Sequence, residues 1–349
     1  MIPTEIHDRN VRALLAPIAD LLASPDVSEI MINGPDQVFV ERRGRIESTE
    51  HRFSGHQALL CAVRGIAQWA GRAVGPDSPI LEARLPDGSR IEAVLPPAAP
   101  DGPILSIRRF SRSSLALDAL VASGGLTHAG ARLLRELVHE RRNVLVSGGT
   151  GSGKTSLLNA LARFIPDDQR VIVIEDAREL QLAHEHVVHL EARPPDARGR
   201  GGVSMRALFR ASLRLRPDRV VVGEVRGPEA IELVQAMTTG HAGCLSTIHG
   251  TTPRDALARL ETLALMSELE LPLWALRAQI ASAVHVIVQT GRAADGSRHV
   301  TEIVELDPRA EGYALHARYR AEHDHDVSET ASDTPDRALG AGTAEARNG

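Results

Sequence analysis

The stretch VLVSGGTGSGKTSLLNAL, residues 144–161, contains Lys154, the only lysine in a chain of 349 residues. Gly148 and Gly153, followed by Lys154 and Thr155, match the pattern G-x-x-x-x-G-K-[ST] of a phosphate-binding loop. The residues NVLVS before it read as a buried strand, and TSLLNALARF after it as a helix. Strand, loop and helix in this order are the setting that the motif requires. The residues predicted to contact phosphate are Gly148, Gly149, Thr150, Gly151, Ser152, Gly153, Lys154, Thr155 and Ser156.

The single lysine has a physical explanation. All other basic residues in the chain are arginines, so the composition favours arginine wherever it can serve. Arginine is a wide, planar fork, whereas lysine is a compact charge on a thin stem. A ring of backbone amides around a phosphate has room for the ammonium group but not for the guanidinium group. We therefore predict that Lys154 is required for its shape as well as its charge.

The composition indicates a cytoplasmic protein with a sizeable core. Hydrophobic residues make up 43% and aromatic residues 3%, so Leu, Val, Ile and Ala must build that core. The formal net charge of −5 argues against an obligate nucleic-acid binder, which usually has a basic excess. No stretch resembles a signal peptide or approaches the length of a membrane span. Cys61 and Cys244 are far apart and form no metal or redox pattern.

The chain divides into four parts. Residues 1–110 read as a small α+β domain, with helical periodicity followed by short strands and turns. Residues 111–118 are polar and are predicted to be a linker. Residues 119–320 alternate strands and helices, as expected of an α/β domain with a parallel sheet covered on both faces. Residues 321–349 have little to bury and are predicted to be disordered.

Two predicted strands of the α/β domain end in acidic residues. RVIVIED ends in Glu175 and Asp176, and RVVVGE ends in Glu224. Ligands of open α/β sheets bind at the carboxyl ends of the strands. An apolar strand that brings a carboxylate next to the phosphate loop is how such enzymes hold Mg²⁺, usually through Asp. Because the acid here is Glu, we expect Glu224 to contact the metal through a bound water.

The histidines allow two interpretations. His241 and His249 are either structural or hydrogen-bonded to a phosphate or catalytic carboxylate, and no complete zinc ligand set accompanies them. For His184, His186 and His189 we favour a solvent-facing strand over a metal site, because further ligands are missing.

The phosphate loop, VIVIEDAREL, LRLRPDRVVVGEVRGPEA and GHAGCLSTIH, in this order, resemble the Walker A, Asp box, Walker B and His box of the secretion ATPase superfamily of type II and type IV systems. Segments such as SEIMINGPDQVFVERRGRIE and EARLPDGSRIEAVLPP resemble its CpaF-type branch of tight-adherence (Flp) pilus and conjugation-associated ATPases. The resemblance covers roughly residues 20 to 310. The four-cysteine zinc insertion of many type II enzymes is absent, which argues against that branch.

The resemblance implies a homohexameric ring of RecA-like C-terminal domains, each joined to a smaller, PAS-like N-terminal domain. It implies that ATP and Mg²⁺ bind between the two domains, and that hydrolysis drives pilus assembly or protein secretion. It also implies a platform protein of the inner membrane as partner and a peripheral position on the cytoplasmic face of that membrane.

The resemblance also implies roles for individual residues. Lys154 would neutralise phosphate charge, while Thr155 and Glu224 would hold Mg²⁺. Glu175 would polarise the attacking water, and His249 would sense the γ-phosphate.

Further candidates come from the same resemblance. His241 is a second candidate for the γ-phosphate sensor. Arg90 and Arg108 match arginines of the N-terminal domain that reach the phosphates, and Arg84 and Arg109 are neighbouring alternatives.

Two other functions stay open on the sequence alone. One is a DNA-translocating or conjugative RecA-type motor, whose DNA contact would be the Arg- and Gly-rich stretch 193–206, although we favour an exposed loop there. The other is a scaffold that binds ATP without turnover. The acids Glu175 and Glu224 argue against a scaffold, and the negative net charge argues against a DNA motor.

Overall fold

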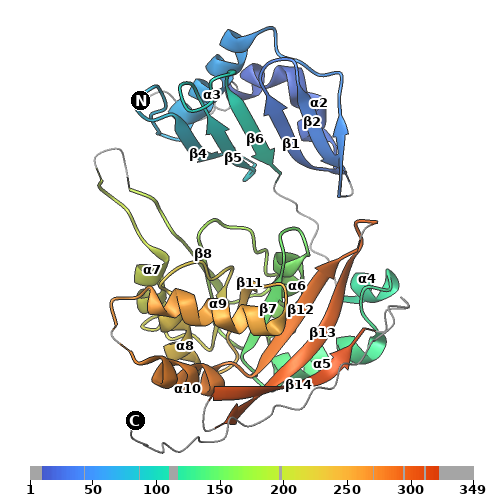
Figure 1. Cartoon of the computed structure of the whole chain (residues 1–349), viewed down its shortest axis with the longest axis vertical. Coiled ribbons are helices and arrows are strands. Elements are labelled where there is room, and N and C mark those ends of the chain that lie inside the picture. Colours follow the sequence, from blue (N-terminus) through green and yellow to red (C-terminus); the bar gives the residue numbers. More distant parts are fainter. Residues whose placement is uncertain are drawn as a thin grey trace, which may run out of the picture.

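The chain forms two β-sheets with separate hydrophobic cores, one above the other in Figure 1. The computed structural model describes residues 10–42, 44–85, 87–109, 117–195, 199–269, 271–293, 295–309 and 312–321. None of the helices in these ranges is long and apolar enough to cross a membrane.

The smaller sheet has six antiparallel strands in the order β3-β2-β1-β6-β5-β4. Alternate residues along its strands are buried, as in an antiparallel sheet that packs on one face. Helix α3 covers that face with apolar residues spaced three and four apart. The elements are η1 (Ala16–Ile18), α2 (Ala19–Ala23), β1 (Val27–Asn33), β2 (Val38–Arg42), β3 (Arg45–Ser48), α3 (His56–Trp69), β4 (Ile80–Arg84), β5 (Arg90–Val94) and β6 (Ile104–Arg108).

The larger sheet has eight strands in the order β14-β13-β12-β7-β11-β10-β8-β9. The six from β12 to β9 are parallel, and β13 and β14 are antiparallel. Its strands are β7 (Val144–Gly148), β8 (Val171–Glu175), β9 (Val187–Glu191), β10 (Arg219–Val222), β11 (Leu245–His249), β12 (Val286–Arg292), β13 (Arg298–Arg309) and β14 (Gly312–Arg320).

Helices cover both faces of this sheet, which explains why β7, β8 and β10 are apolar and buried throughout. One face carries α7 (Met205–Ser212), α8 (Ala230–Thr238), α9 (Pro253–Leu265) and α10 (Leu273–Ala283). The other carries α4 (Leu117–Ala122), α5 (His128–His139) and α6 (Lys154–Ala162). The chain therefore has the mixed α/β architecture that the sequence predicts.

The structure differs from the predicted linker at residues 111–118. Residues 110–116 lie outside the described ranges, but Leu117 and Asp118 open helix α4. Leu117 and Leu120 are buried against the core that α5 and α6 share, and this burial outweighs the polar composition of the segment. Residues 322–349, which include almost all of the predicted disordered tail, lie outside the described ranges.

A buried asparagine fixes the amino-terminal edge of the larger sheet. The side-chain amide of Asn143 donates to the carbonyls of Met237 and Ala283 (3.2 and 2.7 Å), and its oxygen accepts from the amides of Gly243 and Cys244 (2.8 and 3.0 Å). Asn143→Ala leaves four backbone groups without this partner, and each such group costs about 1–3 kcal/mol when buried. We expect a loss of about 3 kcal/mol or more in the free energy of unfolding, measured by urea denaturation.

The matched control is Gln235→Ala, at an exposed position of α8. It should change the free energy of unfolding by less than about 0.5 kcal/mol. A similarly small change for Asn143→Ala would show that this network does not stabilise the edge.

Candidate nucleotide site

Four neighbouring parallel strands bring polar residues to one edge of the larger sheet. In the order β7, β11, β10 and β8, they end at or just before Gly148, His249, Glu224 and Glu175. Strands lie about 4.8 Å apart, so Glu175 belongs to the strand of these four that is farthest from the phosphate loop, roughly 14 Å from β7. The structure thus places both acids at the edge where the loop lies.

The phosphate loop connects β7 to α6, which begins at Lys154. Gly151 and Gly153 have φ angles of +73° and +95°, a region that favours glycine. A Cβ on Gly148 would lie 2.2 Å from Oγ1 of Thr290, so no side chain fits there. The free amides in the first turn of α6 attract an anion. All residues predicted to contact phosphate are contiguous in this loop and turn.

Lys154 lies inside the loop and is only 8% exposed. Its Nζ donates to the carbonyls of Gly148 (3.0 Å) and Gly149 (2.8 Å) and lies 3.4 Å from Nδ1 of His249. Burial lowers the pKa of the ammonium group, and the charge of Glu224 opposes this shift. Because it contacts two carbonyls of the loop, the ammonium group is within reach of a phosphate that the loop binds.

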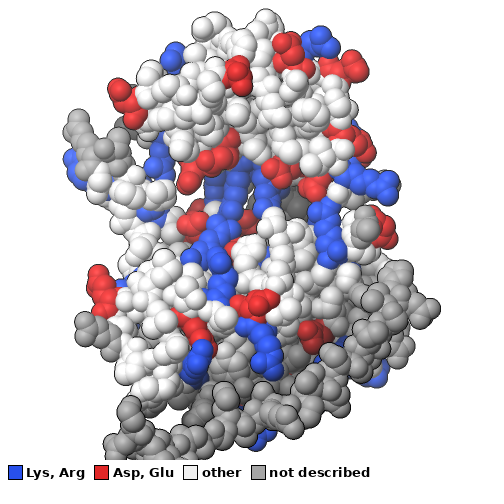
Figure 2. Space-filling view, viewed as in Figure 1, with Lys and Arg blue, Asp and Glu red and all other residues white. Residues whose placement is uncertain are grey.

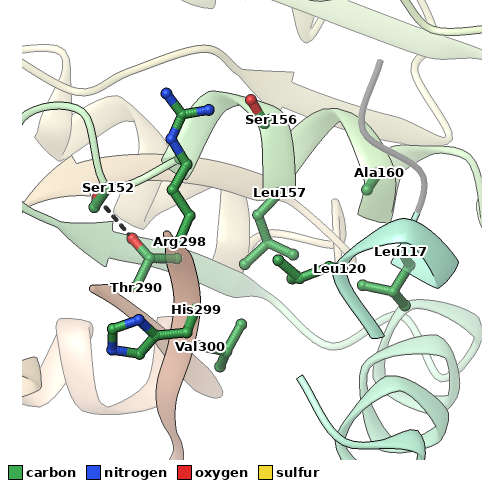
Figure 3. Close-up of a pocket in the computed structure, with 11 residues that line it drawn as sticks. Leu117, Leu120, Ser152, Ser156, Leu157, Ala160, Thr290, Arg298, His299 and Val300 are labelled. Atoms are coloured by element: carbon green, nitrogen blue, oxygen red, sulfur yellow. Dashed lines mark hydrogen bonds between the residues drawn. The ribbon is translucent and has the colours of Figure 1, made fainter. Parts of the chain in front are cut away.

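Thr290 and Arg298, which were not predicted from the sequence, also contact the phosphate loop. Oγ1 of Thr290 donates to the carbonyl of Ser147 (2.9 Å) and lies 2.8 Å from Oγ of Ser152 (Figure 3). Nε of Arg298 donates to the carbonyl of Gly151 (3.1 Å). Thr290 belongs to β12 and Arg298 to β13, so long-range strand pairing places them. The polar residues QTGR that end the apolar strand β12 were the available signal.

Glu175 is a buried carboxylate at the end of β8, 3% exposed. Its Oε1 accepts hydrogen bonds from the amides of Glu179 (2.8 Å) and Leu180 (2.9 Å). Its Oε2 lies 3.8 Å from Nδ1 of His189. A Cβ on Gly223 of the neighbouring strand end would lie 2.9 Å from Cγ of Glu175, so this glycine makes room for the acid. One oxygen shapes the turn after β8, and among the described residues the other has only the longer contact to His189.

Glu224 connects the lysine side of the site to an arginine. Nη2 of Arg226 donates to Oε2 of Glu224 (2.7 Å). Nε2 of His249 lies 2.9 Å from Oε1, but not in hydrogen-bond geometry, so this buried oxygen has no donor within the described ranges. Lys154, His249, Glu224 and Arg226 therefore form a continuous row of charged and polar groups.

The charge states in this row follow from its contacts. Burial raises the pKa of Glu224, but the hydrogen bond and charge of Arg226, with the nearby His249 and Lys154, outweigh it, so the pKa is lowered. Burial and the charge of Lys154 lower the pKa of His249. At neutral pH we therefore expect an ionised Glu224 and a neutral His249.

The acids and hydroxyl at this edge fit a magnesium ion. Mg²⁺ prefers oxygen ligands and keeps several waters, so a carboxylate can support it directly or through water. Oε1 of Glu224 is buried without a hydrogen-bond donor in the described part of the chain. Thr155 lies in the first turn of α6 next to Lys154. Glu224 and Thr155 are the residues that would hold the ion.

A row of arginines on the smaller sheet faces this edge. Arg84, Arg90 and Arg108 lie directly opposite one another on β4, β5 and β6. Nη1 of Arg84 lies 2.8 Å from Oε1 of Glu191, and Nη2 of Arg90 lies 3.0 Å from Oε1 of Glu179. Figure 2 shows basic side chains gathered between the two halves of the molecule. Since like charges in register repel, the row requires anionic partners.

Arg108 is the member of the row without an acidic partner among the described residues. Burial is the main cause of the lowered pKa of Lys154, and the charge of Arg108 contributes to it. Arg109 points elsewhere, because its Nη1 donates to the carbonyls of Val27 and Ser24 within the smaller unit. Among the described residues, Arg108 is therefore a better candidate for a phosphate-binding cation than Arg109 and Arg90, whose side chains have partners.

Most of the chain matches a protein-family model. Residues 12–322 match the model described as "Type II/IV secretion system protein". The chain belongs to this family. The recognition of a secretion ATPase superfamily from four ordered motifs is thereby confirmed.

Curated relatives of this family member cover most of its length. It is 37% identical over 298 residues to a putative conjugal transfer protein of Mycobacterium tuberculosis, covering 84% of each chain. It is 35% identical over 332 residues to the conjugal transfer protein TrbB of Rhizobium radiobacter, covering 93% of this chain and 97% of that one. It is 36% identical over 304 residues to a homologue of the type IV secretion system protein PtlH from Bordetella bronchiseptica, covering 79% and 89%.

Two solved structures show the same fold. The pilus retraction motor PilT with bound ADP aligns with a TM-score of 0.59 at 20% identity, covering 88% of this chain and 83% of that one. The ATPase DotB of Legionella pneumophila aligns with a TM-score of 0.59 at 20% identity, covering 84% and 80%.

In this member of the secretion family, the two histidines of the His box lie at opposite edges of the larger sheet. His249 ends β11, whereas His241 precedes that strand. Gly243 and Cys244, just after His241, bond to Asn143 at the opposite edge of the sheet. Because strand β11 crosses the sheet between them, His241 is not part of the loop site of this chain.

The remaining predicted features are the histidines of residues 184–189 and the arginine-rich stretch 193–206. His189 lies on β9 near Glu175, while Nε2 of His184 contacts the carbonyl of Pro166 (3.0 Å). Within the described ranges, no three His, Cys, Asp or Glu side chains are grouped to hold a metal ion. In the arginine-rich stretch, Arg193 and Val203 pair as an isolated antiparallel bridge, and residues 196–198 lie outside the described ranges.

A small, mainly apolar pocket lies beside the loop, next to the first two turns of α6 (Figure 3). In the close-up, Arg298 and Ser156 extend above the leucines that form its wall. The pocket would accept an apolar part of a ligand whose phosphates occupy the loop. It is lined by Leu117, Leu120, Ser152, Gly153, Ser156, Leu157, Ala160, Thr290, Arg298, His299 and Val300.

Proposed function

We propose that this chain is a Mg²⁺-dependent ATPase that works as a homohexamer and drives substrate transfer in a type IV secretion or conjugation apparatus. The observation that carries the proposal is the row from Lys154 through His249 and Glu224 to Arg226 beside the phosphate loop. Relatives named for conjugal transfer and type IV secretion support transfer over Flp pilus assembly.

In this proposal, ATP binds between the two units of one subunit. The loop and the first turn of α6 bind the phosphates, and Lys154 and Arg108 balance their charge. Mg²⁺, held by Thr155 and Glu224, would offset further negative charge. Glu175 orients the attacking water, and His249 is placed to respond to the γ-phosphate because it contacts both Lys154 and Glu224.

The smaller unit would control when hydrolysis occurs. A six-stranded antiparallel sheet with one helix-covered face supports a PAS-like domain, and two arginines of its row pair with acids that follow or end strands of the larger sheet. An arginine placed by domain closure stabilises transition-state charge only in the closed arrangement. We propose that ring assembly at the cytoplasmic face of the inner membrane, with a membrane platform protein as partner, produces that arrangement.

Phosphate release at increasing protein concentration tests this proposal. We expect specific activity to rise as subunits assemble and to be abolished when EDTA removes Mg²⁺. ATP binding without hydrolysis at every concentration would favour a scaffold instead. Hydrolysis that depends on DNA and falls steeply with salt would favour a DNA-translocating motor contacting DNA through residues 193–206.

A further inference from the structure

The side chain of Arg292, at the end of β12, contacts the smaller sheet and lies beside the phosphate loop. Its Nη2 lies 3.3 Å from Oε1 of Glu41 and donates to the carbonyl of Gly44. Its Nη1 lies 3.1 Å from the position of a Cβ on Gly151, at the turn of the loop. Figure 1 shows the upper ends of β12 and β13 reaching toward the smaller sheet. One guanidinium group of the larger unit thus binds the smaller sheet at a position next to the loop.

The strand pair that carries Arg292 also holds the loop in place. Thr290 contacts Ser147 and Ser152, and Arg298 donates to the carbonyl of Gly151. Arg292 therefore lies between Thr290 and Arg298 in the sequence. Among the described residues, it is the one residue of strands β12 and β13 that contacts Glu41.

Charge repulsion makes Glu41 important for this arrangement. Arg292 and Arg298 are directly opposite on β12 and β13, and like charges in register repel. Arg298 donates to the carbonyl of Gly151 and Arg292 lies beside the same glycine, so their repulsion acts next to the loop. Glu41 is the acid that pairs with Arg292, and it comes from the other unit. When the smaller sheet moves away, that neutralising charge leaves the loop.

We propose that the Glu41–Arg292 pair is a link through which the position of the smaller sheet sets the conformation of the phosphate loop. Arg292 is then a positioning residue for nucleotide binding, acting through Gly151. This inference rests on the proposed function, because it assumes that the loop binds ATP. It differs from the role of Arg108, since Glu41 acts on the loop without reaching a phosphate.

The other ion pairs between the units provide a matched control. Arg84–Glu191 also joins the smaller sheet to the larger unit, at 2.8 Å. Neither residue contacts the phosphate loop in any described interaction. Glu191→Gln therefore removes a connection between the units without changing the charges at Gly151.

The experiment is a double-mutant cycle on the full chain, with binding of the fluorescent analogue mant-ATP in Mg²⁺ as the first readout and phosphate release as the second. We expect Glu41→Gln to weaken mant-ATP binding roughly threefold to fivefold, the range for a partly exposed ion pair. In an Arg292→Ala background the same substitution should have no further effect, because its partner is gone. Glu191→Gln should have the same effect in both backgrounds.

Additive effects of Glu41→Gln and Arg292→Ala would overturn the link. If Arg292→Ala does not fold, Glu41→Gln and Glu191→Gln decide the question in the wild-type background, where equal effects on mant-ATP binding would also overturn it. Wild type that binds mant-ATP without hydrolysing it would contradict the proposed function and leave the link measurable by binding. Wild type that binds no nucleotide would overturn both.

Discussion

Lys154→Arg is expected to lower the rate of ATP hydrolysis on the order of 100-fold, although it keeps the positive charge. Lys154 is a buried residue, and its ammonium group lies 3.0 and 2.8 Å from two carbonyls of the loop. A guanidinium group is wider and planar, so it cannot occupy this position without opening the loop. Phosphate release, together with mant-ATP binding, measures both consequences.

Lys154→Ala is the matched control, because it removes charge and shape together. If shape decides, the Arg and Ala variants should be similarly inactive, with unfolding temperatures close to that of wild type. Since Lys154 is the only lysine, an amine-specific acylating reagent should modify a single side chain, and ATP should protect it. Normal turnover by Lys154→Arg would show that our explanation of the lone lysine is wrong.

Local sequence was sufficient to predict the parts of the site that follow one strand each. A buried strand, a glycine-rich loop and a helix are adjacent in the chain, so their pattern predicts the loop. The location of the acidic residues could be predicted in the same way, because parallel strands have their carboxyl ends at one edge of a sheet. In the structure, β8 and β10 are paired in parallel, with Glu175 and Glu224 at their carboxyl ends.

Sequence could not predict contacts that depend on the order of strands. His241 and His249 are eight positions apart and belong to one motif, yet a strand crosses the sheet between them. Thr290 and Arg298 reach the loop only because β12 pairs with β7 and β13 with β12. Neither pairing has a local signal that would identify the partner strand.

The packing of the two units was also outside the reach of sequence patterns. The arginine row on the smaller sheet was predicted to reach phosphates. In the structure, Arg84 and Arg90 pair with Glu191 and Glu179, and Arg108 lacks such a partner within the described ranges. Ion pairs between the units decide which arginine lacks an acidic partner. These pairs depend on how the two units pack, which sequence patterns do not show.

Glu175→Gln is expected to bind ATP like wild type and to hydrolyse it roughly 100- to 1,000-fold more slowly. Oε1 of Glu175 accepts from the amides of Glu179 and Leu180, and the oxygen of a glutamine side chain can accept both hydrogen bonds. The substitution therefore keeps the turn after β8 and removes the charge. Equilibrium mant-ATP binding and phosphate release on the same preparation separate the two properties.

Glu224→Gln is the matched comparison that distinguishes the acid that supports Mg²⁺ from the acid that orients the attacking water. Glu224 lies nearer to the loop and pairs with Arg226, so its loss should raise the Mg²⁺ concentration needed for activity. Glu175→Gln should leave that Mg²⁺ dependence unchanged. If Glu175→Gln hydrolyses ATP normally while Glu224→Gln is inactive at saturating Mg²⁺, Glu224 orients the water. Glu175, on the strand beyond that of Glu224, would then serve only to shape the turn that its buried oxygen holds.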